Sequence, residues 1–453
     1  MHSIKQNIYN NLPITFKNIL VTVYNLRFFK IYGRKYQILL KEIENIFFNF
    51  SYEEIQKLQN DQFMKLIGFV SSRNPYYKKI LKGIEIHSLK DINKLPVMIK
   101  DDLRNENIKS KVDDSIIKGY TGGTTGKSLS FGMTLDDYIQ REATITFFRG
   151  IYSYQFKDKI AWFSGKEIIT NKEVQKNIFW VKDLLNNITY YSTFHLIDEY
   201  IDATINNLNI SKIEFMAGFP SAIYDIAKRW HKTGVEKKIK LKAIFPTSEP
   251  LHEYQKKFLM EFFDCPVPDQ YASSEGAPFI YECFEGNLHY DMSSGIFEII
   301  DPVTNEILVT SFTTHYMPLI RYKIGDSIIF DDVSKKCKCG SNMPLVKQII
   351  GRSVSYVYSN ERGRVTNSNI ANVIKYMSNI EKMQLIQNKI DEIDINIVSN
   401  NKNLNKIKNE LEYELRYRLG DKIKFNYFFV NDIPAERNGK YLMVKNNITK
   451  LLE

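Results

Sequence analysis

Short apolar runs alternate with helix-like segments through the middle of the chain, and this alternation most constrains the fold. The runs at residues 160–163, 212–216 and 243–246 have the length and composition of buried strands. A helix-like segment begins at Pro220, a residue that favours the first turn of a helix. Strands that feed helices in this way predict an α/β fold. With 453 residues, the chain is long enough for two or three domains and a large core.

The N-terminal part of the chain predicts helices. Residues 1–50 mix apolar and basic side chains and are expected to form helices that pack on the main body. Apolar residues keep helical spacing over 58–70, and the pair Asn74-Pro75 ends that helix.

The C-terminal part predicts a second, smaller domain. Residues 391–398 alternate like a half-buried strand, residues 404–419 form an amphipathic helix ended by Gly420, and residues 423–430 form another strand candidate. The predicted domains are a large N-terminal one with mixed β-sheets and helices, residues 1–352, and a small, mobile α+β one, residues 353–453.

A glycine- and threonine-rich run at residues 120–130 is the best clue to chemistry. Its glycines allow the backbone to approach a ligand, and successive N–H groups in such a loop form a concave anion site. The spacing is not that of a Walker A motif. A flexible surface loop is the alternative, and a cradle for a polyphosphate is the functional interpretation. The expected phosphate-binding residues are Thr121, Gly122, Gly123, Thr124, Thr125, Gly126 and Lys127.

Four more segments follow this run, at 270–276, 321–326, 351–352 and 434–440. In this order and at this spacing, the five segments resemble the core motifs of the adenylate-forming superfamily, which contains acyl-CoA synthetases, adenylation domains of peptide synthetases and luciferases. The finer resemblance is to the phenylacetate–CoA ligase branch and its relatives in capsular polysaccharide biosynthesis, over about residues 50–453. The segments that carry the finer resemblance are 218–221, 248–251, 269–278, 282–283, 317–322 and 337–340.

The resemblance implies an N-terminal AMP-binding domain and an enzyme that joins a carboxylic acid to the α-phosphate of ATP, with Mg²⁺ as cofactor. Charge builds on the phosphoryl oxygens, so fixed donors, the metal ion and a cation are needed. Glu275 is expected to bind Mg²⁺, since hard oxygen ligands suit that ion. Lys440 is expected to bridge the carboxylate and α-phosphate oxygens, and Thr124 to act on the phosphates.

The same resemblance assigns the nucleotide contacts. Tyr271 is expected against the adenine, and Asp326 is expected to accept both ribose hydroxyls, as an ionised carboxylate can. Arg352 is expected to contact the ribose or a phosphate. The remaining residues expected to line the nucleotide are Ser248, Glu249 and Ser274.

Each of these residues also has an ordinary structural interpretation. Glu275 can be a loop carboxylate, Tyr271 a core aromatic, Asp326 a turn carboxylate after Gly325, and Lys440 an exposed lysine in a lysine-rich chain. A non-catalytic scaffold that binds nucleotide is the rival from another class of protein. The presence of all the motif residues argues against this rival.

The acceptor of the activated acid is left open. Family members usually follow the Gly-Arg pair with acidic residues at the hinge, whereas this chain has Ser353-Val354-Ser355. Adenylation is therefore better supported than transfer. Coenzyme A, a sugar, an amine or a carrier protein are the acceptors considered, and the acid itself is not identified.

The four cysteines form a separate constellation. Cys337 and Cys339 are a tight pair, and the resemblance places Cys283 nearby. Soft thiolates at such spacing suit a structural Zn²⁺ ion, which needs a fourth ligand to close the tetrahedron. The alternative is four buried, inert thiols. The candidates for the fourth ligand are His289, His252 and Cys265.

Charge and composition limit the partners. Residues 1–120 contain 20 Lys+Arg and 12 Asp+Glu, which is +8 of the net +10. This segment can meet phosphates, an anionic membrane face or nucleic acid, or simply be a solvated surface. No nucleic-acid-binding motif is present. We expect no nucleic-acid partner and no transmembrane segment, a cytoplasmic location and, as an option, a homodimer.

Overall fold

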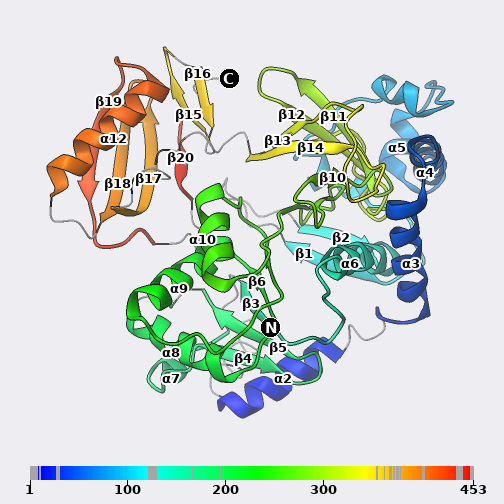
Figure 1. Ribbon diagram of the computed structural model, residues 1–453. Coiled ribbons are helices and arrows are strands. Elements are labelled where there is room, and N and C mark those ends of the chain that lie inside the picture. Colours follow the sequence, from blue (N-terminus) through cyan, green and yellow to red (C-terminus); the bar gives the residue numbers. More distant parts are fainter. Residues whose placement is uncertain are drawn as a thin grey trace.

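A computed structural model shows three bodies, a five-stranded sheet with its helices, a seven-stranded sheet with N-terminal helices, and a C-terminal unit (Figure 1). No helix among the described residues is both long and apolar enough to cross a membrane. The structure describes residues 9, 12–26, 31–120, 130–164, 168–193, 195–196, 198–352, 356–361, 363–366, 370, 373, 377, 379–399, 403–434 and 442–448.

Helices dominate the N-terminal part, as predicted. The helix expected over 58–70 is confirmed as part of α4 (Tyr52–Arg73). It begins with a capping box, in which Ser51 Oγ accepts from Glu54 N and Glu54 Oε2 accepts from Ser51 N. The other elements here are α2 (Ile14–Leu26), α3 (Arg34–Asn49), α5 (Pro75–Ile80) and the 3₁₀ turns η2 (Leu89–Lys94), η3 (Asp102–Arg104) and η4 (Glu106–Ile108).

A short hairpin brackets the glycine-rich run. Strands β1 (Ile116–Tyr120) and β2 (Ser130–Thr134) are antiparallel, and Tyr120 pairs with Ser130. The two ends of residues 121–129, which lie outside the described residues, are therefore held together. Thr134 at the end of β2 is also the N-cap of the long helix α6 (Leu135–Gly150).

The five-stranded sheet has the order β4-β5-β3-β6-β7 and is parallel except for β4. This confirms the α/β expectation and the strands predicted at 160–163 and 243–246, while the strand predicted at 212–216 begins three residues later, at Phe215. Helices α8, α9 and α10 bury their apolar faces in a core that includes Ile223, Trp230 and Leu259. The elements are β3 (Ile160–Ser164), α7 (Asn171–Val174), β4 (Trp180–Asp183), β5 (Ile188–Ser192), α8 (Asp198–Ile210), β6 (Phe215–Gly218), α9 (Pro220–Thr233), β7 (Ala243–Pro246) and α10 (Glu253–Phe263).

The seven-stranded sheet is antiparallel throughout, in the order β11-β12-β13-β14-β10-β9-β8. Helices α3, α4 and α6 share a core with it, where Phe47, Phe147 and Tyr281 pack together. Its strands are β8 (Gln270–Tyr271), β9 (Ile280–Glu282), β10 (Leu288–Tyr290), β11 (Gly295–Asp301), β12 (Glu306–Ser311), β13 (Tyr322–Phe330) and β14 (Leu345–Arg352).

The C-terminal unit has its own apolar core and lies apart from the seven-stranded sheet, above α9 and α10 in Figure 1. The predicted strand–helix–strand unit is confirmed as β18, α12 and β19, with β18 and β19 parallel. Lys382 on β17 contacts Asp225 of α9 at 3.2 Å and Asp432 at 3.2 Å, and so joins this unit to the five-stranded body. The elements are β15 (Tyr356–Ser359), β16 (Gly363–Thr366), β17 (Ile380–Lys389), β18 (Glu392–Ser399), α12 (Leu404–Leu419), β19 (Lys424–Phe429) and β20 (Val444–Asn446).

Candidate active site and a Cys/His cluster

Two of the predicted nucleotide residues meet between β8 and β13. The Tyr271 hydroxyl donates to Asp326 Oδ2 at 2.7 Å, and both side chains are buried. Across the β13–β14 ladder, Asp326 stands directly opposite Arg352. The pairing of β13 with β14 brings Asp326 and Arg352 together, and the side-chain hydrogen bond from Tyr271 joins β8 to them.

The loop after β7 lies next to these residues. Gln270 Nε2 donates to Pro246 O at 2.9 Å, which ties β8 to the carboxyl end of β7. Pro250 Cγ lies 3.8 Å from the point where a Cβ on Gly351 would stand. The carboxyl ends of parallel strands are the usual ligand-binding edge of α/β sheets. The candidate active site, meaning Tyr271, Asp326, Arg352 and the loops at 247–250 and 272–277, lies at that edge.

Ser248 and Glu249 occupy the loop after β7. Ser248 is exposed and has φ of 70°, a conformation that costs energy for a side chain other than glycine. Glu249 Oε2 accepts from Ser221 N at 3.3 Å and from Ser221 Oγ at 2.7 Å, so Glu249 caps the first turn of α9. A nucleotide contact for either residue stays a prediction.

Glu275 sits in a loop whose backbone is tightly held. Ser273 Oγ accepts from the N–H groups of Gly276 and Ala277, at 3.1 and 3.0 Å. Gly276 has φ of +108°, and a Cβ there would stand 2.3 Å from Thr314 Cγ2, so a larger residue would shift the loop. The Glu275 side chain is 8 % exposed, and no hydrogen bond or ion pair joins it to another described residue. Ser274 beside it is exposed.

Arg141 on α6 supports this loop. Its Nη1 donates to Ala277 O at 2.9 Å and to Thr313 Oγ1 at 3.1 Å, and its Nη2 donates to Ser273 O at 3.3 Å. The guanidinium carbon also lies 4.3 Å from the centroid of the Phe279 ring. Burial lowers the pKa of Arg141 to about 10, which still leaves the side chain charged near neutral pH. One buried cation thus fixes both ends of the segment that carries Glu275.

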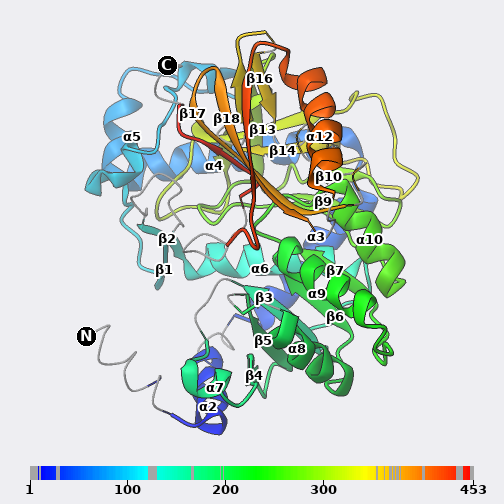
Figure 2. The same cartoon turned by 90° about the vertical axis from the view of Figure 1, so that its left-hand side faces the viewer.

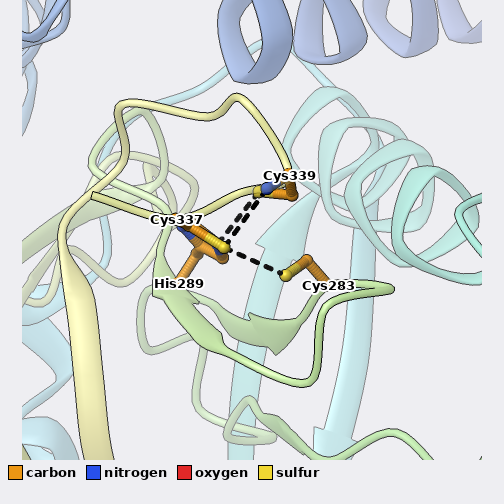
Figure 3. Close-up of side chains that lie close together, drawn as sticks. All are labelled: Cys283, His289, Cys337 and Cys339. Carbon is orange, nitrogen blue, oxygen red and sulfur yellow. Dashed lines mark hydrogen bonds between the residues drawn. The ribbon is translucent and has the colours of Figure 1, made fainter.

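The cysteine pair meets Cys283 and His289 at the other end of the same sheet. Cys283 follows β9, His289 is in β10, and Cys337 and Cys339 lie in the loop between β13 and β14 (Figure 3). One ligand atom from each residue lies within 4.8 Å of all the others. These four residues are called the Cys/His cluster below, and their cysteines are not in disulfides.

The separations in the Cys/His cluster fit a tetrahedral ion. Cys283 Sγ and Cys337 Sγ are 3.7 Å apart, and Cys339 Sγ and His289 Nε2 are 3.4 Å apart. Bonds of about 2.3 Å to sulfur and about 2.0 Å to nitrogen would give tetrahedral edges of about 3.8 and 3.5 Å. His289 Nδ1 lies 3.1 Å from Met343 O, and a hydrogen bond there leaves Nε2 unprotonated and aimed at the thiols.

The geometry selects His289 among the three candidates for the fourth ligand. Cys265 belongs to the core around α10, with Leu259, and burial raises the pKa of its thiol to about 12. His252 is the N-cap residue of α10, and burial lowers its pKa to about 4. Expecting Cys265 or His252 beside Cys283 was therefore wrong, because both lie in the five-stranded body rather than in the antiparallel sheet.

Comparisons with known proteins identify the family of the chain. A family model described as the CapK C-terminal domain matches residues 357–447. Protein CapK of Staphylococcus aureus is 33% identical over 455 residues, which cover 97% of this chain and 99% of the relative. The chain belongs to the CapK family.

More distant relatives are CoA ligases, and those of known structure share the fold of this CapK-family chain. Phenylacetate-coenzyme A ligase of Thermus thermophilus is 23% identical over 337 residues, 66% of this chain and 71% of the relative. The crystal structure of 2-hydroxyisobutyryl-CoA ligase in the postadenylation state has a TM-score of 0.71 at 15% identity, and covers 90% of this chain and 93% of that one. The same ligase in its thioesterification state has a TM-score of 0.53. The resemblance found in the sequence and the expected fold are thus confirmed.

Several predicted site residues of the CapK-family chain cannot be placed. Lys440 and the hinge residues 353–355 lie outside the described residues, as does the side chain of Arg352. The same holds for the whole predicted phosphate cradle, which comprises Thr121, Gly122, Gly123, Thr124, Thr125, Gly126 and Lys127. Their roles stay predictions.

The sequence interpretation missed two polar groups that hold the site of this CapK-family chain. One is Arg141, and the other is Asp137, whose Oδ1 lies 2.6 Å from His315 Nδ1 and whose Oδ2 accepts from His315 N at 2.8 Å. The available signal was an acid and a base four positions apart, at 137 and 141, on the buried face of a helix. Charged residues on such a face are rarely left without a partner.

Proposed function

We propose that the chain activates a carboxylic acid as an acyl adenylate at the expense of ATP and then passes the acyl group to an acceptor. A carboxylate oxygen would attack the α-phosphorus, the bond from that phosphorus to the bridging β-phosphate oxygen would break, and pyrophosphate would leave. CapK family membership and the fold of adenylate-forming ligases support this reaction class.

The observation that carries the proposal is the buried pair of Tyr271 and Asp326 with Arg352 opposite. A carboxylate at the ligand-binding edge can accept two ribose hydroxyls, and the tyrosine that donates to it fixes its orientation. The Tyr271 ring would then lie along the base. Arg352 would supply positive charge beside the ribose or a phosphate. The meeting of three of the sequence motifs, at 270–276, 321–326 and 351–352, supports this arrangement.

Glu275 fits a Mg²⁺ ion. It is a carboxylate in a held loop, it is almost buried, and no described residue pairs with it. A hard oxygen ligand of this kind suits Mg²⁺, which usually binds one or two carboxylates together with substrate phosphates. When bound there, Mg²⁺ would offset negative charge on the phosphate oxygens. The role of the protein is to hold the carboxylate in place through Ser273 and Arg141.

The arrangement of the two domains supports a two-step reaction. The whole chain superposes better on the postadenylation state of the related ligase than on its thioesterification state, with TM-scores of 0.71 and 0.53. The ion pair of Lys382 with Asp225 is a contact that the C-terminal unit would release in order to turn. Lys440 would serve adenylation in one arrangement and withdraw for the acceptor in the other, by rotation at residues 353–355.

The acceptor that we propose is coenzyme A, which occurs in the names of the related ligases. A sugar, an amine or a carrier protein is the second candidate, favoured by the departure from the usual hinge at residues 353–355. We further propose that the product is used in the biosynthesis of a surface polysaccharide, on the strength of CapK family membership.

We also propose that the Cys/His cluster holds one structural Zn²⁺ ion. His289 and Cys283 have no measurable exposure, so the four ligands would form a closed site without a position for substrate. The Phe47 ring of α3 packs edge-on against His289 with 5.3 Å between centroids. The ion would fasten the β9–β10 turn to the β13–β14 loop beneath the N-terminal helices.

Acid-dependent exchange between pyrophosphate and ATP, measured over a panel of carboxylic acids, tests the proposed reaction. Asp326→Asn should weaken ATP binding by about 10- to 100-fold, the range expected when a hydrogen bond to a charged group is lost. Asp331→Asn is the matched control, because Asp331 is a carboxylate just after β13 whose partners are the exposed Lys335 and the N–H of Asp332. The control should bind ATP normally.

Adding coenzyme A to the same assay identifies the acceptor. Formation of a thioester supports the first candidate, and adenylate that accumulates regardless of coenzyme A supports the second. ATP binding without exchange for any acid in the panel would favour a nucleotide-binding scaffold and contradict the proposal.

A further inference from the structure

Helix α2 has an unusual arrangement, because the side that faces the protein carries four polar residues beside Ile14 and Val21, while the exposed side is apolar. Lys17, which has no measurable exposure, donates to Glu173 Oε2 at 2.6 Å. Asn25 Nδ2 donates to Asp183 Oδ2 at 2.6 Å. Thr22 Oγ1 accepts from Leu184 N at 3.0 Å, and Asn18 Oδ1 accepts from Lys182 N at 2.8 Å. Four polar residues of one helix therefore bind the region between α7 and the β4–β5 turn.

The apolar side of α2 faces outward. Phe16, Val23 and Tyr24 are 56%, 56% and 57% exposed, and together with their neighbours they recur at the spacing of a single helical stripe. An ordinary surface helix has the opposite arrangement, with its apolar stripe in the core. The outward apolar residues of this 13-residue helix are Phe16, Ile19, Leu20, Val23, Tyr24 and Leu26.

The β4–β5 turn extends this apolar face. Leu184 is 57% exposed and Leu185 is 46% exposed. The bond from Leu184 N to Thr22 places the turn directly beside the helix. Figures 1 and 2, which differ by a quarter turn, both show α2 at the lower edge of the molecule next to β4, away from the C-terminal unit. A contiguous exposed apolar surface usually marks an interaction site.

Charge indicates which partner covers this face. Residues 1–41 contain seven Lys and Arg residues and no Asp or Glu. Lys17 pairs with Glu173 and Lys35 pairs with Asp136, whereas Arg34 at the start of α3 and Lys41 in its middle are exposed. Two copies that met through this face would bring two such basic segments together, which disfavours self-association. An anionic lipid bilayer would attract the basic residues and take up the apolar stripe in its interior.

We propose that α2 and the β4–β5 turn dock the enzyme on the surface of an anionic lipid bilayer. The helix would lie in the plane of the interface, with Phe16, Leu20 and Val23 among the acyl chains and basic residues near the headgroups. The buried pair of Lys17 and Glu173 would keep α2 attached to the protein while its apolar face enters the lipid. This inference does not depend on the proposed reaction.

Sedimentation of the full chain with vesicles tests the proposal. Vesicles of phosphatidylglycerol and phosphatidylcholine should bind at least about tenfold more protein than vesicles of phosphatidylcholine alone, and added salt should reduce the difference. The double change Leu20→Glu and Val23→Glu should lower binding by at least about tenfold. Val303→Glu is the matched control, since Val303 is 89% exposed and lies on the far sheet. This variant should bind like the unchanged protein.

A second measurement does not depend on disrupting the helix. Phe16→Trp adds an indole at the centre of the proposed contact, and brominated acyl chains quench indoles that enter the bilayer. Quenching should exceed that of the unchanged protein, in which Trp230 is buried, Trp162 is partly buried, and Trp180 is partly buried in the cluster beneath α2. Equal quenching, absence of binding to anionic vesicles, or full binding by the double variant would overturn the proposal. A stable dimer that the double variant dissociates would assign the face to self-association instead and would also overturn it.

Discussion

The candidate active site and the Cys/His cluster lie at opposite ends of the same strands. Asp326 in the middle of β13 stands opposite Arg352, the last residue of β14, whereas Cys337 and Cys339 occupy the loop that joins the other ends of these two strands. The strand β9 separates the two regions in the same way, with the Tyr271 pairing at its start and Cys283 after its end. One sheet thus carries two kinds of polar site.

The two sites differ in the partners of their polar side chains. In the Cys/His cluster, the four ligand atoms converge on each other within 4.8 Å and leave no room for a substrate. In the candidate active site, polar groups hold loops and present carboxylates, and Glu275 has no partner among the described residues. Changes in the cluster should therefore cost stability, while changes in the active site should cost activity.

The largest effect is expected in the cluster. Changing Cys337 and Cys339 to serine removes two ligands, so bound zinc should fall from about one ion per chain to none. The unfolding free energy should fall by about 5 kcal/mol, because zinc binding contributes directly to folding. Metal analysis and chemical denaturation measure the two quantities.

Cys265→Ser is the matched control for this change, as Cys265 is a buried thiol outside the cluster. It should keep the zinc. The opposite result would be an unsubstituted protein that carries no metal after purification without chelator and is still fully stable. That result would support four inert thiols.

The next largest effect is expected at Lys440, and it should be confined to activity. Lys440→Ala should lower kcat for acid-dependent pyrophosphate release by about 10²- to 10³-fold, the usual cost of losing one donor to developing charge. Zinc content and ATP binding should not change. Lys422→Ala, at an exposed lysine of the same domain, is the control. Normal adenylation by the Lys440 variant would remove this residue from the mechanism.

A change at Arg141 should affect both stability and activity. Arg141 reaches Ala277 O and Thr313 Oγ1 through Nη1 and Ser273 O through Nη2, and the single nitrogen of a lysine cannot stand at both positions. Arg141→Lys should therefore lower the unfolding free energy by about 2 kcal/mol through an unpaired buried carbonyl. It should also raise the Mg²⁺ concentration that supports exchange, since the Glu275 loop loses its support. Denaturation and Mg²⁺ titration measure the effects. Arg73→Lys, at a half-exposed arginine, should change neither.

The smallest effect concerns pH. Burial tends to lower the pKa of His315, but the hydrogen bond and charge of Asp137 outweigh burial, so the pKa lies above its ordinary value. The charged pair therefore stabilises the fold below about pH 6.5, and this contribution is lost as the pH rises through the folded-state pKa.

Urea denaturation at two pH values checks this linkage. The difference between the unchanged protein and His315→Gln should be about 1 kcal/mol at about pH 5.5 and smaller at about pH 9, given the partial exposure of the pair. His87→Gln, at an exposed histidine, should show no such trend. A difference that grows with pH would mean that neutral His315 is the stabilising form.

Much of the fold could be predicted from local pattern. The strands at 160–163 and 243–246 and the helix ended by Gly420 were confirmed, because apolar periodicity and helix-ending residues act over a few neighbours. The orientation of helix α2 could not be predicted, because its periodicity only says that one side is apolar. Whether that side faces inward depends on Glu173 and Asp183, more than 150 positions away.

The sequence by itself determined the family, the reaction class that we propose and the residue types of both sites, because motif order and spacing survive without coordinates. Tertiary structure decided which residues meet. It chose His289 over Cys265 and His252 as the partner of the cysteines, and it added Arg141 and the pair of Asp137 with His315 to the active-site support. The physical reason is that a ligand or a hydrogen-bond partner is defined by separations of a few ångström, and these arise from strand pairing between residues that are distant in the chain.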